Sequence, residues 1–299
     1  MTRIGGAGAP IQAPPPGKDL PLDGHLHTDR SHDSRVPIDA YAALAIANRI
    51  PEIAITDHVD FDPALPGYLP DEQSRQRMVR EAAERWAPHG VAIRFGVEIS
   101  YEIEREDEIR AFMRGIPYDY AIGSVHVGPR SPFHRDSVAG WARGRPIGEV
   151  VAPYFEEVAA AARSGLFDTI GHLDFVKRYV AAHVTPAELA AAPEVYEPVL
   201  RALVEHGVAL EVNTSGLRQV ARETYPAPWV VARYRELGGR HVVSGSDAHV
   251  EGHFGSGLDL GYAAIRDAGF EVLTFRRGGG RVTIDMPRPN ASARPSFTP

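Results

Sequence analysis

Two alternating patterns of apolar residues run along most of the chain. Short, nearly continuous apolar runs are typical of buried strands, and apolar residues three or four positions apart are typical of helices that pack on a core. Strands are predicted at residues 22–26, 52–56, 91–99, 119–124, 168–170, 208–212 and 241–244, with a weaker one at 272–275. Helices are predicted at residues 38–48, 71–86, 106–113, 149–164, 186–205, 227–237 and 258–268. The pattern is thus a repeated unit of one strand and one helix.

This regular succession predicts an α/β fold with parallel strands. Glycines such as Gly165 and Gly207 stand where left-handed helix ends are expected. No linker interrupts residues 20–276, which we interpret as one domain. Residues 1–19 are rich in Gly and Pro and residues 277–299 in Gly, Pro and Ser, so we expect a disordered leader and a flexible C-terminal tail. An open doubly wound sheet and a barrel both fit this alternation.

The composition narrows the class of protein. The 299 residues are 43% hydrophobic and 24% charged, as in an ordinary globular protein. The 32 Lys and Arg are outnumbered by 39 Asp and Glu, and the formal net charge of -7 argues against a nucleic-acid partner. No apolar run approaches the ~20 residues of a membrane helix and no secretion signal is evident, so we expect a soluble, cytoplasmic protein without a membrane partner. Cysteine is absent, so a bound metal would need His, Asp or Glu ligands.

Ligand-type residues follow most of the predicted strands. The carboxyl ends of parallel strands carry the active site in such folds, and a barrel gathers these ends around one mouth, whereas an open sheet spreads them along a line. We therefore favour the barrel and expect these side chains to converge. The candidates are His25, His27, Asp57, His58, Glu98, His126, His172, Asp247 and His249, with His32 or Asp33 in the loop after the first strand.

The spacing within two of these motifs favours metal binding. His25 and His27 lie two positions apart, as do Asp247 and His249, and the two-residue period of a strand places both members of a pair on one side. Imidazole and carboxylate ligands suit zinc, manganese or iron. A catalytic ion uses about three protein ligands, so this set is about right for two or three ions. Clusters of divalent ions are typical of enzymes that hydrolyse phosphate esters.

A structural role is the alternative at each position. A lone buried His, such as His126 or His172, is more often a hydrogen-bonded core residue than a ligand, but repetition at successive strand ends is hard to assign to chance. We interpret Asp57 as a residue that orients a neighbouring imidazole. His134 and His253, in predicted mouth loops, stay open. Four histidines away from the strand ends are interpreted as structural or surface residues: His89, His183, His206 and His241.

The motifs occur in a fixed order along the chain: His25-Leu26-His27, Thr56-Asp57-His58, Glu98, Ser124-Val125-His126, Gly171-His172 and Ser246-Asp247-Ala248-His249. This series resembles the PHP (polymerase and histidinol phosphatase) superfamily over about residues 22–275. The segments 171–174, 211–218 and 225–229 look like its monofunctional histidinol-phosphatase branch, although the loops 127–130 and 252–257 depart from that pattern. The resemblance implies a distorted seven-stranded β/α barrel, similar to a TIM barrel. It also implies a trinuclear metal centre and a phosphomonoesterase of histidine biosynthesis that acts on L-histidinol phosphate.

The resemblance further implies how the ligands are divided among three ions. Asp33 is preferred to His32, because the family's ligand lies at that distance beyond the His-x-His pair. Glu98, Asp247 and His249 are expected to serve catalysis as well as metal binding. One ion would take His25, His27, Glu98 and Asp247; a second would share Glu98 and add His126 and His172; a third would take Asp33, His58 and His249.

Substrate contacts are predicted after the fifth and sixth strands. Arg218, Lys177 and Arg178 are candidates for phosphate binding, and an Arg side chain can hold phosphate oxygens through two parallel hydrogen bonds. Asp174 is a candidate partner for the substrate's amine or imidazole. The motif after the sixth strand adds Asn213 and Ser215 as substrate-binding candidates.

Three other functions stay open. The first is a phosphoesterase of the same superfamily that acts on another small phosphate, such as a nucleotide. The second is a non-catalytic metal-binding or DNA-associated module like those attached to DNA polymerases, against which the complete ligand set and the acidic charge argue. The third is an amidohydrolase-type barrel, which usually has a carboxylated or bridging Lys at a strand end, a residue that the sequence does not place there. The sequence does not indicate the oligomeric state.

Overall fold

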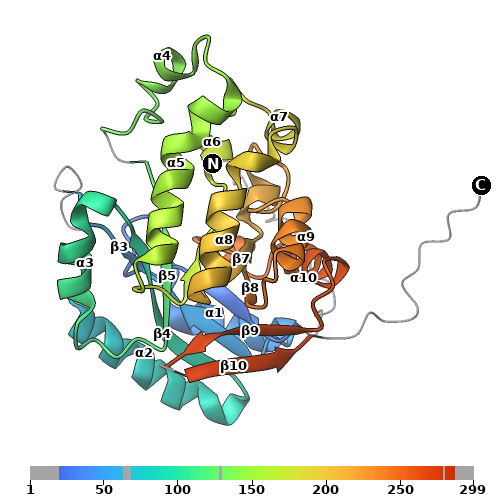
Figure 1. Ribbon diagram of the computed structural model, residues 1–299. Coiled ribbons are helices and arrows are strands. Elements are labelled where there is room, and N and C mark those ends of the chain that lie inside the picture. Colours follow the sequence, from blue (N-terminus) through green and yellow to red (C-terminus); the bar gives the residue numbers. More distant parts are fainter. Residues whose placement is uncertain (1–19, 63–68, 128–129, 279, 287–299) are drawn as a thin grey trace, which may run out of the picture.

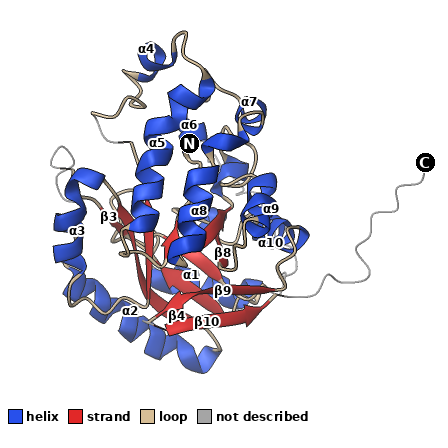
Figure 2. Ribbon diagram, in the orientation of Figure 1, coloured by secondary structure: helices blue, strands red, loops and turns tan. Residues whose placement is uncertain are grey.

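A ten-stranded sheet forms the centre of the computed structural model, which describes residues 20–62, 69–127, 130–278 and 280–286 (Figures 1 and 2). The strands follow the order β1–β2–β4–β5–β6–β7–β8–β9–β10, and β3 pairs with β4 beside that path. Their bounds are β1 Asp23–Leu26, β2 Glu52–Ile55, β3 His58–Val59, β4 Ala92–Ser100, β5 Tyr120–Ser124, β6 Thr169–Ile170, β7 Ala209–Asn213, β8 Val242–Gly245, β9 Val272–Arg277 and β10 Gly280–Asp285. The mixed α/β class and the predicted strands are therefore confirmed.

The strands from β1 to β8 are parallel, and β9 and β10 are antiparallel to their neighbours. Strands β5, β7 and β8 are buried at every position, as expected for parallel strands covered on both sides. This is why their sequences are continuous apolar runs rather than alternating ones. All parallel strands point the same way, so their carboxyl ends lie along one edge.

The sheet differs from a seven-stranded closed barrel in its strand number and in its pairing. Strands β1 and β8 are not neighbours in the hydrogen-bonded ladder. The carboxyl end of β1 does meet the residues after β8: Leu26 and Ala248 form an isolated parallel bridge, and the amide of His27 donates to the carbonyl oxygen of Ala248 at 3.0 Å. The amide of Asp247 likewise donates to the carbonyl oxygen of His25 at 2.9 Å. The two ends of the parallel region are thus brought together at the edge that carries the ligand-type residues.

Helices surround the sheet, and α5 and α8 pack side by side on one part of it (Figure 1). Most of them follow a strand directly, in agreement with the predicted units. Their bounds are α1 Ile38–Asn48, α2 Glu72–Trp86, α3 Glu106–Met113, α4 Val138–Ala142, α5 Ile147–Arg163, α6 Val176–Val180, α7 Pro186–Ala190, α8 Glu197–His206, α9 Pro228–Glu236 and α10 Leu258–Asp267. Among the described residues, no helix has the length and apolar character needed to cross a lipid bilayer.

Three predictions about the chain's organisation are corrected. The single helix predicted at 186–205 is two helices, because Pro193 begins a separate turn of 3-10 helix between α7 and α8, and a capping box at Thr185 starts α7. The short helices α4 and α6 were not predicted, since five residues are too few for a recognisable period. The tail predicted from residue 277 is wrong for residues 280–285, which pair with β9, for example Ile284 with Leu273. Residues 1–19 and 287–299, predicted as leader and tail, lie outside the described residues.

Candidate metal centre

The carboxyl ends of the parallel strands place the predicted ligands around one cavity. Its volume is about 500 Å³, and its lining includes His58 of β3, Glu98 of β4 and Asp33 from the loop between β1 and α1. The cavity is also lined by His126, His172, Asp247 and His249, each of which lies shortly after a strand. His25 and His27 are fully buried beside it. The prediction that the side chains after the strands converge is therefore confirmed.

Glu98 lies at the centre of this group and is 1% exposed. Both of its carboxylate oxygens face imidazole rings that come from different strand ends. Five ring nitrogens of the described residues lie within 4 Å of these oxygens: His25 Nε2 at 3.2 Å, His27 Nε2 at 3.3 Å, His58 Nδ1 at 3.1 Å, His126 Nε2 at 3.6 Å and His172 Nε2 at 2.8 Å. A carboxylate in this position is suited to bridge two cations.

A first group of ligand atoms joins His25, His27 and Asp247, whose nitrogen and oxygen atoms all lie within 4.8 Å of one another. Asp247 Oδ1 is 3.4 Å from His27 Nε2 and 3.9 Å from His25 Nε2. The two histidines are on the same side of β1 and its extension, as the two-residue spacing predicts. Together with Glu98 these residues offer two imidazoles and two carboxylates to one ion.

A second group joins His58, Glu98 and His126, again within 4.8 Å. His172 Nε2 reaches Glu98 Oε1 at 2.8 Å, the same oxygen that faces His126, and the rings of His126 and His172 lie 5.1 Å apart. Ser100 Oγ contacts His126 Nδ1 at 2.7 Å, which leaves His126 Nε2 directed toward Glu98.

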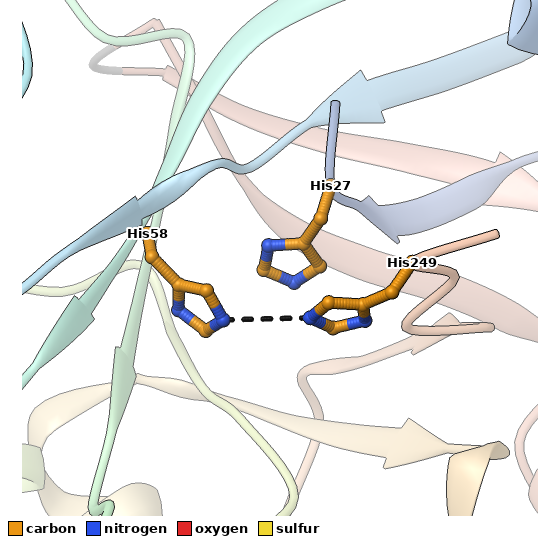
Figure 3. Close-up of side chains that lie close together, drawn as sticks. All are labelled: His27, His58 and His249. Atoms are coloured by element: carbon orange, nitrogen blue, oxygen red, sulfur yellow. Dashed lines mark hydrogen bonds between the residues drawn. The ribbon is translucent and has the colours of Figure 1, made fainter. Parts of the chain in front are cut away.

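A third group lies at the mouth, where His27, His58 and His249 point toward one another (Figure 3). His58 Nε2 and His249 Nε2 are 3.5 Å apart. Asp33 Oδ2 is 3.1 Å from His249 Nε2 and 3.6 Å from His58 Nε2, so Asp33 closes this group with a carboxylate. His32 also lines the cavity: its Nε2 lies 3.9 Å from Asp33 Oδ2, and its ring centroid lies 5.4 Å from that of His58.

Three nitrogens in the cluster fit a cation particularly well. His25 Nε2, His27 Nε2 and His58 Nδ1 are buried and have no hydrogen-bond partner among the described residues. A buried nitrogen without a partner is costly, and a metal ion that takes its lone pair removes that cost. The donor set contains imidazole and carboxylate but no sulfur, as zinc, manganese and iron accept. The residues present therefore fit a metal centre.

The electrostatics of the cluster point the same way. Burial opposes ionisation of Glu98, but the surrounding histidines hold its carboxyl pKa well below the usual range, and the same holds for Asp247. Burial disfavours a charged His58 ring, yet Glu98 and Asp33 raise its pKa to about 9. Burial lowers the pKa of His126 to about 4. The ionised carboxylates thus attract positive charge into the site, as protons on rings such as His58 or as metal ions.

The comparisons with known proteins agree with this geometry. The sequence profile of the PHP domain matches residues 23–215. The chain belongs to the PHP domain family. It is 32% identical over 266 residues to a probable histidinol-phosphatase of Deinococcus radiodurans, a match that covers 85% of this chain and 96% of that protein. It is 27% identical over 270 residues to a histidinol-phosphatase of Lactococcus lactis, covering 85% of this chain and 94% of that protein.

A solved structure has the same fold. It is the histidinol phosphate phosphatase of Lactococcus lactis complexed with zinc, L-histidinol and phosphate. The TM-score is 0.75 at 24% sequence identity, and the alignment covers 88% of this chain and 98% of that one. A second structure, of a putative histidinol phosphatase from Listeria monocytogenes, aligns with a TM-score of 0.68 at 20% identity over 80% of this chain and 99% of that one.

Part of the predicted substrate set lines the PHP cavity. Arg178, Ser215 and Arg218 are among its lining residues, as is His253, which the sequence left open. Arg218 donates from Nη2 to the carbonyl oxygens of Ser246 at 2.8 Å and Asp247 at 3.2 Å. These contacts fix the guanidinium beside the ligand-bearing loop after β8.

Asn213 has a supporting place in the site. It is buried at the end of β7, its Nδ2 lies 3.4 Å from Asp247 Oδ2, and its Oδ1 accepts a hydrogen bond from the amide of Ser215 at 2.9 Å. The side chain therefore contacts a metal-ligand candidate rather than the cavity.

Two predicted substrate contacts do not agree with the structure. Lys177 and Asp174 are fully buried and absent from the described cavity lining, and Lys177 Nζ lies 2.8 Å from Asp174 Oδ2. Lys177 also donates to Glu223 Oε1 at 2.8 Å, and Tyr196 donates its hydroxyl to Asp174 Oδ2 at 3.1 Å. Asp174 lies in the turn before the short helix α6 and Lys177 in its first turn, and both side chains face inward, which the sequence pattern did not reveal.

Asp57 orients an imidazole, as predicted, but not through its neighbour's ring. Its carboxylate accepts hydrogen bonds from the amide of Thr28 at 2.6 Å and from Ser31 Oγ at 3.1 Å. Ser31 Oγ in turn lies 3.2 Å from His27 Nδ1. Asp57 therefore acts on His27 through Ser31, a residue that sequence reasoning missed because nothing in the motif spacing marks it.

Proposed function

We propose that this chain is a metal-dependent phosphomonoesterase that hydrolyses L-histidinol phosphate to histidinol and phosphate, a step of histidine biosynthesis. The observation that carries the proposal is the arrangement of five imidazoles around the Glu98 carboxylate at the mouth of a PHP fold. The relatives named histidinol-phosphatase match this chain over most of their length. The substrate assignment draws on these relatives, and the chemistry draws on the cluster itself.

The three ligand groups support a centre of three divalent ions of zinc, manganese or iron. Such ions, when bound, neutralise phosphate oxygens and make a nucleophile from water near neutral pH. Glu98 would be shared between the ions, since its two oxygens face different sets of rings. Asp247 and His249 would hold ions beside the phosphate from the loop after β8, where both side chains line the cavity. The ligands of this centre are His25, His27, Asp33, His58, Glu98, His126, His172, Asp247 and His249.

Arginines that line the cavity would help the ligand cluster hold the phosphate. Arg218 and Arg178 both line the cavity, and a guanidinium binds two phosphate oxygens at once. Ser215 also lines the cavity and offers a hydroxyl. Their role is to orient the ester so that its phosphorus faces the ligand cluster.

Asp60 takes the place that the sequence suggested for Asp174. L-Histidinol carries an amine and an imidazole, so its phosphate ester needs a partner of negative charge. Among the described lining residues, Asp60 is the carboxylate that lies outside the proposed ligand set. An ion pair between Asp60 and the substrate amine would distinguish this ester from phosphates without a cationic group.

The strand arrangement supports the distorted barrel expected for this family. Strands β1, β2, β4, β5, β6, β7 and β8 are successive parallel neighbours, and the bridge between Leu26 and Ala248 brings the first and last of them together. Strand β3 extends the line of β2, and β9 and β10 add an antiparallel hairpin outside the barrel. The ligands then ring one mouth.

A substrate comparison tests this function. Protein reconstituted with zinc, manganese or iron is assayed for phosphate release from L-histidinol phosphate, nucleoside monophosphates and p-nitrophenyl phosphate. We expect the highest kcat/KM for L-histidinol phosphate. A tenfold or greater preference for a nucleotide, about 1.4 kcal/mol of transition-state discrimination, would rule out the substrate and leave the metal chemistry in place.

A further inference from the structure

A buried carboxylate from β7, Glu211, lies directly behind the ligand cluster. It is 1% exposed and uses both oxygens. Oε1 is 2.7 Å from His25 Nδ1, and Oε2 accepts the main-chain amide hydrogen of His172 at 2.8 Å. Asn213 Nδ2 also donates to Oε2 at 3.1 Å. One carboxylate therefore contacts two ligand-bearing segments that come from different strand ends.

The contact with His25 selects one form of the ring. A carboxylate is an acceptor, so the hydrogen of a neutral His25 lies on Nδ1, and the lone pair of Nε2 is left free. That nitrogen lies 3.2 Å from Glu98 Oε2 and has no hydrogen-bond partner among the described residues. Glu211 thus directs the ligand atom of His25 toward the cluster.

The contact with His172 holds an unusual backbone. His172 has a φ of 22°, outside the regions that residues with a side chain prefer. Its amide donates to Glu211 Oε2 at 2.8 Å, which holds the backbone in this conformation. The ring of His172 then reaches Glu98 Oε1 at 2.8 Å. This strained backbone conformation therefore places the ring of His172 beside Glu98, where it can act as a ligand.

Two glycines leave the space that this arrangement needs. A Cβ on Gly245 would lie 2.3 Å from His25 Cβ and 2.9 Å from Glu211 Oε1. A Cβ on Gly171 would lie 2.4 Å from Ser124 Oγ and 3.5 Å from Glu211 Oε2. A side chain at either glycine would therefore collide with residues beside the Glu211 carboxylate.

We propose that Glu211 is a positioning residue of the metal centre, which fixes the Nδ1–H form of His25 and the backbone of His172 so that both rings meet the cluster around Glu98. This role rests on the metal centre of the proposed function but not on the identity of its substrate. Asn213 extends the network, because its Nδ2 lies 3.1 Å from Glu211 Oε2 and 3.4 Å from Asp247 Oδ2. Glu211 therefore reaches a third ligand segment through Asn213.

The test compares Glu211→Gln with Glu52→Gln. A glutamine keeps the shape but has one oxygen, so it loses one of the two accepted contacts. Glu52 is also largely buried, at 15% exposure, and pairs with Arg94 and Arg277, but it lies at the opposite, amino end of β2. Zinc affinity is measured by competition with a chelator, and the gain in Tm on adding zinc is measured beside it.

Glu211→Gln is expected to bind zinc roughly 10–100-fold more weakly and to show a smaller zinc-dependent gain in Tm, with the Tm of the chelator-treated protein little changed. Glu52→Gln is expected to keep the wild-type zinc affinity. Equal zinc affinity and equal gain in Tm for wild type and both variants would overturn the proposal. A merely structural role would instead lower the Tm of the chelator-treated protein and leave the zinc affinity unchanged.

Zinc-loaded wild-type protein provides a test that needs no variant. Proton–nitrogen NMR spectra of the histidine side chains are expected to show His25 with its hydrogen on Nδ1. A hydrogen on Nε2 would overturn the proposal. The zinc-binding and NMR measurements use no phosphate ester. They therefore test the role of Glu211 independently of the substrate assignment, which is tested by phosphate release.

Discussion

Two buried ionic clusters lie near the end of β6, and they differ in how their charges are balanced. In the first, Lys177 Nζ is within 2.8 Å of both Asp174 and Glu223 and 3.2 Å from the carbonyl oxygen of Thr224. One oxygen, Asp174 Oδ1, has no hydrogen-bond partner there. In the second, the ion-pair partners of Glu98 among the described residues are all histidines.

The difference separates a structural cluster from a binding site. Lys177 places its amine against both carboxylates, so the counter-charge in this cluster comes from the chain itself. The cluster around Glu98 has carboxylates whose pKa values are held low and rings with unpartnered nitrogens, but no Lys or Arg among its described ion pairs. A cluster of this kind is completed by cations from outside the chain, and this is what directs the metal ions to it.

The largest expected effect comes from removing the charge at the centre of the second cluster. Glu98→Gln is expected to lower kcat by roughly 10³-fold or more, because the carboxylate shared between ions is lost. Steady-state phosphate release and metal content are measured together. His89→Gln and His206→Gln, at exposed positions, are the controls and are expected to retain nearly full activity. Similar losses of kcat in all three variants would contradict the claim that the residues at the strand ends form the active site.

The matching change in the first cluster is expected to affect stability instead. Lys177→Met leaves Asp174 and Glu223 without their cation and is expected to cost about 3–5 kcal/mol of unfolding free energy. Urea denaturation measures the loss, and elemental analysis is expected to find the wild-type metal content. If Lys177→Met lost metal while its unfolding free energy stayed unchanged, Lys177 would belong to the metal centre. The two clusters would then not differ in function.

Arg218 is the proposed phosphate-binding residue beside the second cluster, and its removal tests the function of that cluster more finely. Arg218→Ala is expected to lower kcat/KM for the phosphate ester by about 10–100-fold with the metal content unchanged, since charged hydrogen bonds to phosphate are lost. Arg201→Ala, on the exposed surface of α8, is the control. An unchanged kcat/KM would remove Arg218 from the phosphate site.

A smaller effect is expected in the pH dependence of the chelator-treated protein. Glu98 and Asp33 raise the pKa of His58 to about 9 despite burial, compared with about 6.5 in the unfolded chain. A raised pKa means that the charged ring stabilises the folded state fully below pH 6.5, and that this contribution is lost as the pH rises through 9. The Tm difference between wild type and His58→Gln is therefore expected to narrow from pH 6 to pH 9. A constant difference would show that the cluster does not hold a proton on His58.

The convergence of the candidate ligands could be predicted because it depends on periodic structure. His25 and His27 share one side through the period of a strand, and parallel strands bring Glu98 and Asp247 to the same edge whatever the loops between them. The helix α1 was predicted with its observed bounds, since its apolar pattern continues over eleven residues. These features follow from local pattern and from topology.

Other features depend on contacts that local pattern does not carry. Asp174 and Lys177 follow a strand end, as the ligands do, but the turn before the five-residue helix α6 and the first turn of that helix direct them inward. Glu211 lies within an apolar strand run and was not chosen as a candidate, although a charged residue in such a run was a signal that could have found it. The sequence pattern predicts a flexible tail in place of strand β10, because Gly and Arg obscure the alternation of Val282 and Ile284.

The number of metal ions per active chain tests the central claim most directly. Protein is stripped with a chelator, reconstituted with zinc or manganese and freed of excess metal, and its metal content and its rate of phosphate release from L-histidinol phosphate are measured on the same sample. The account predicts more than one equivalent per chain in fully active protein, approaching three, and loss of activity as the content falls below this level. A fully active protein with one equivalent or none would contradict it.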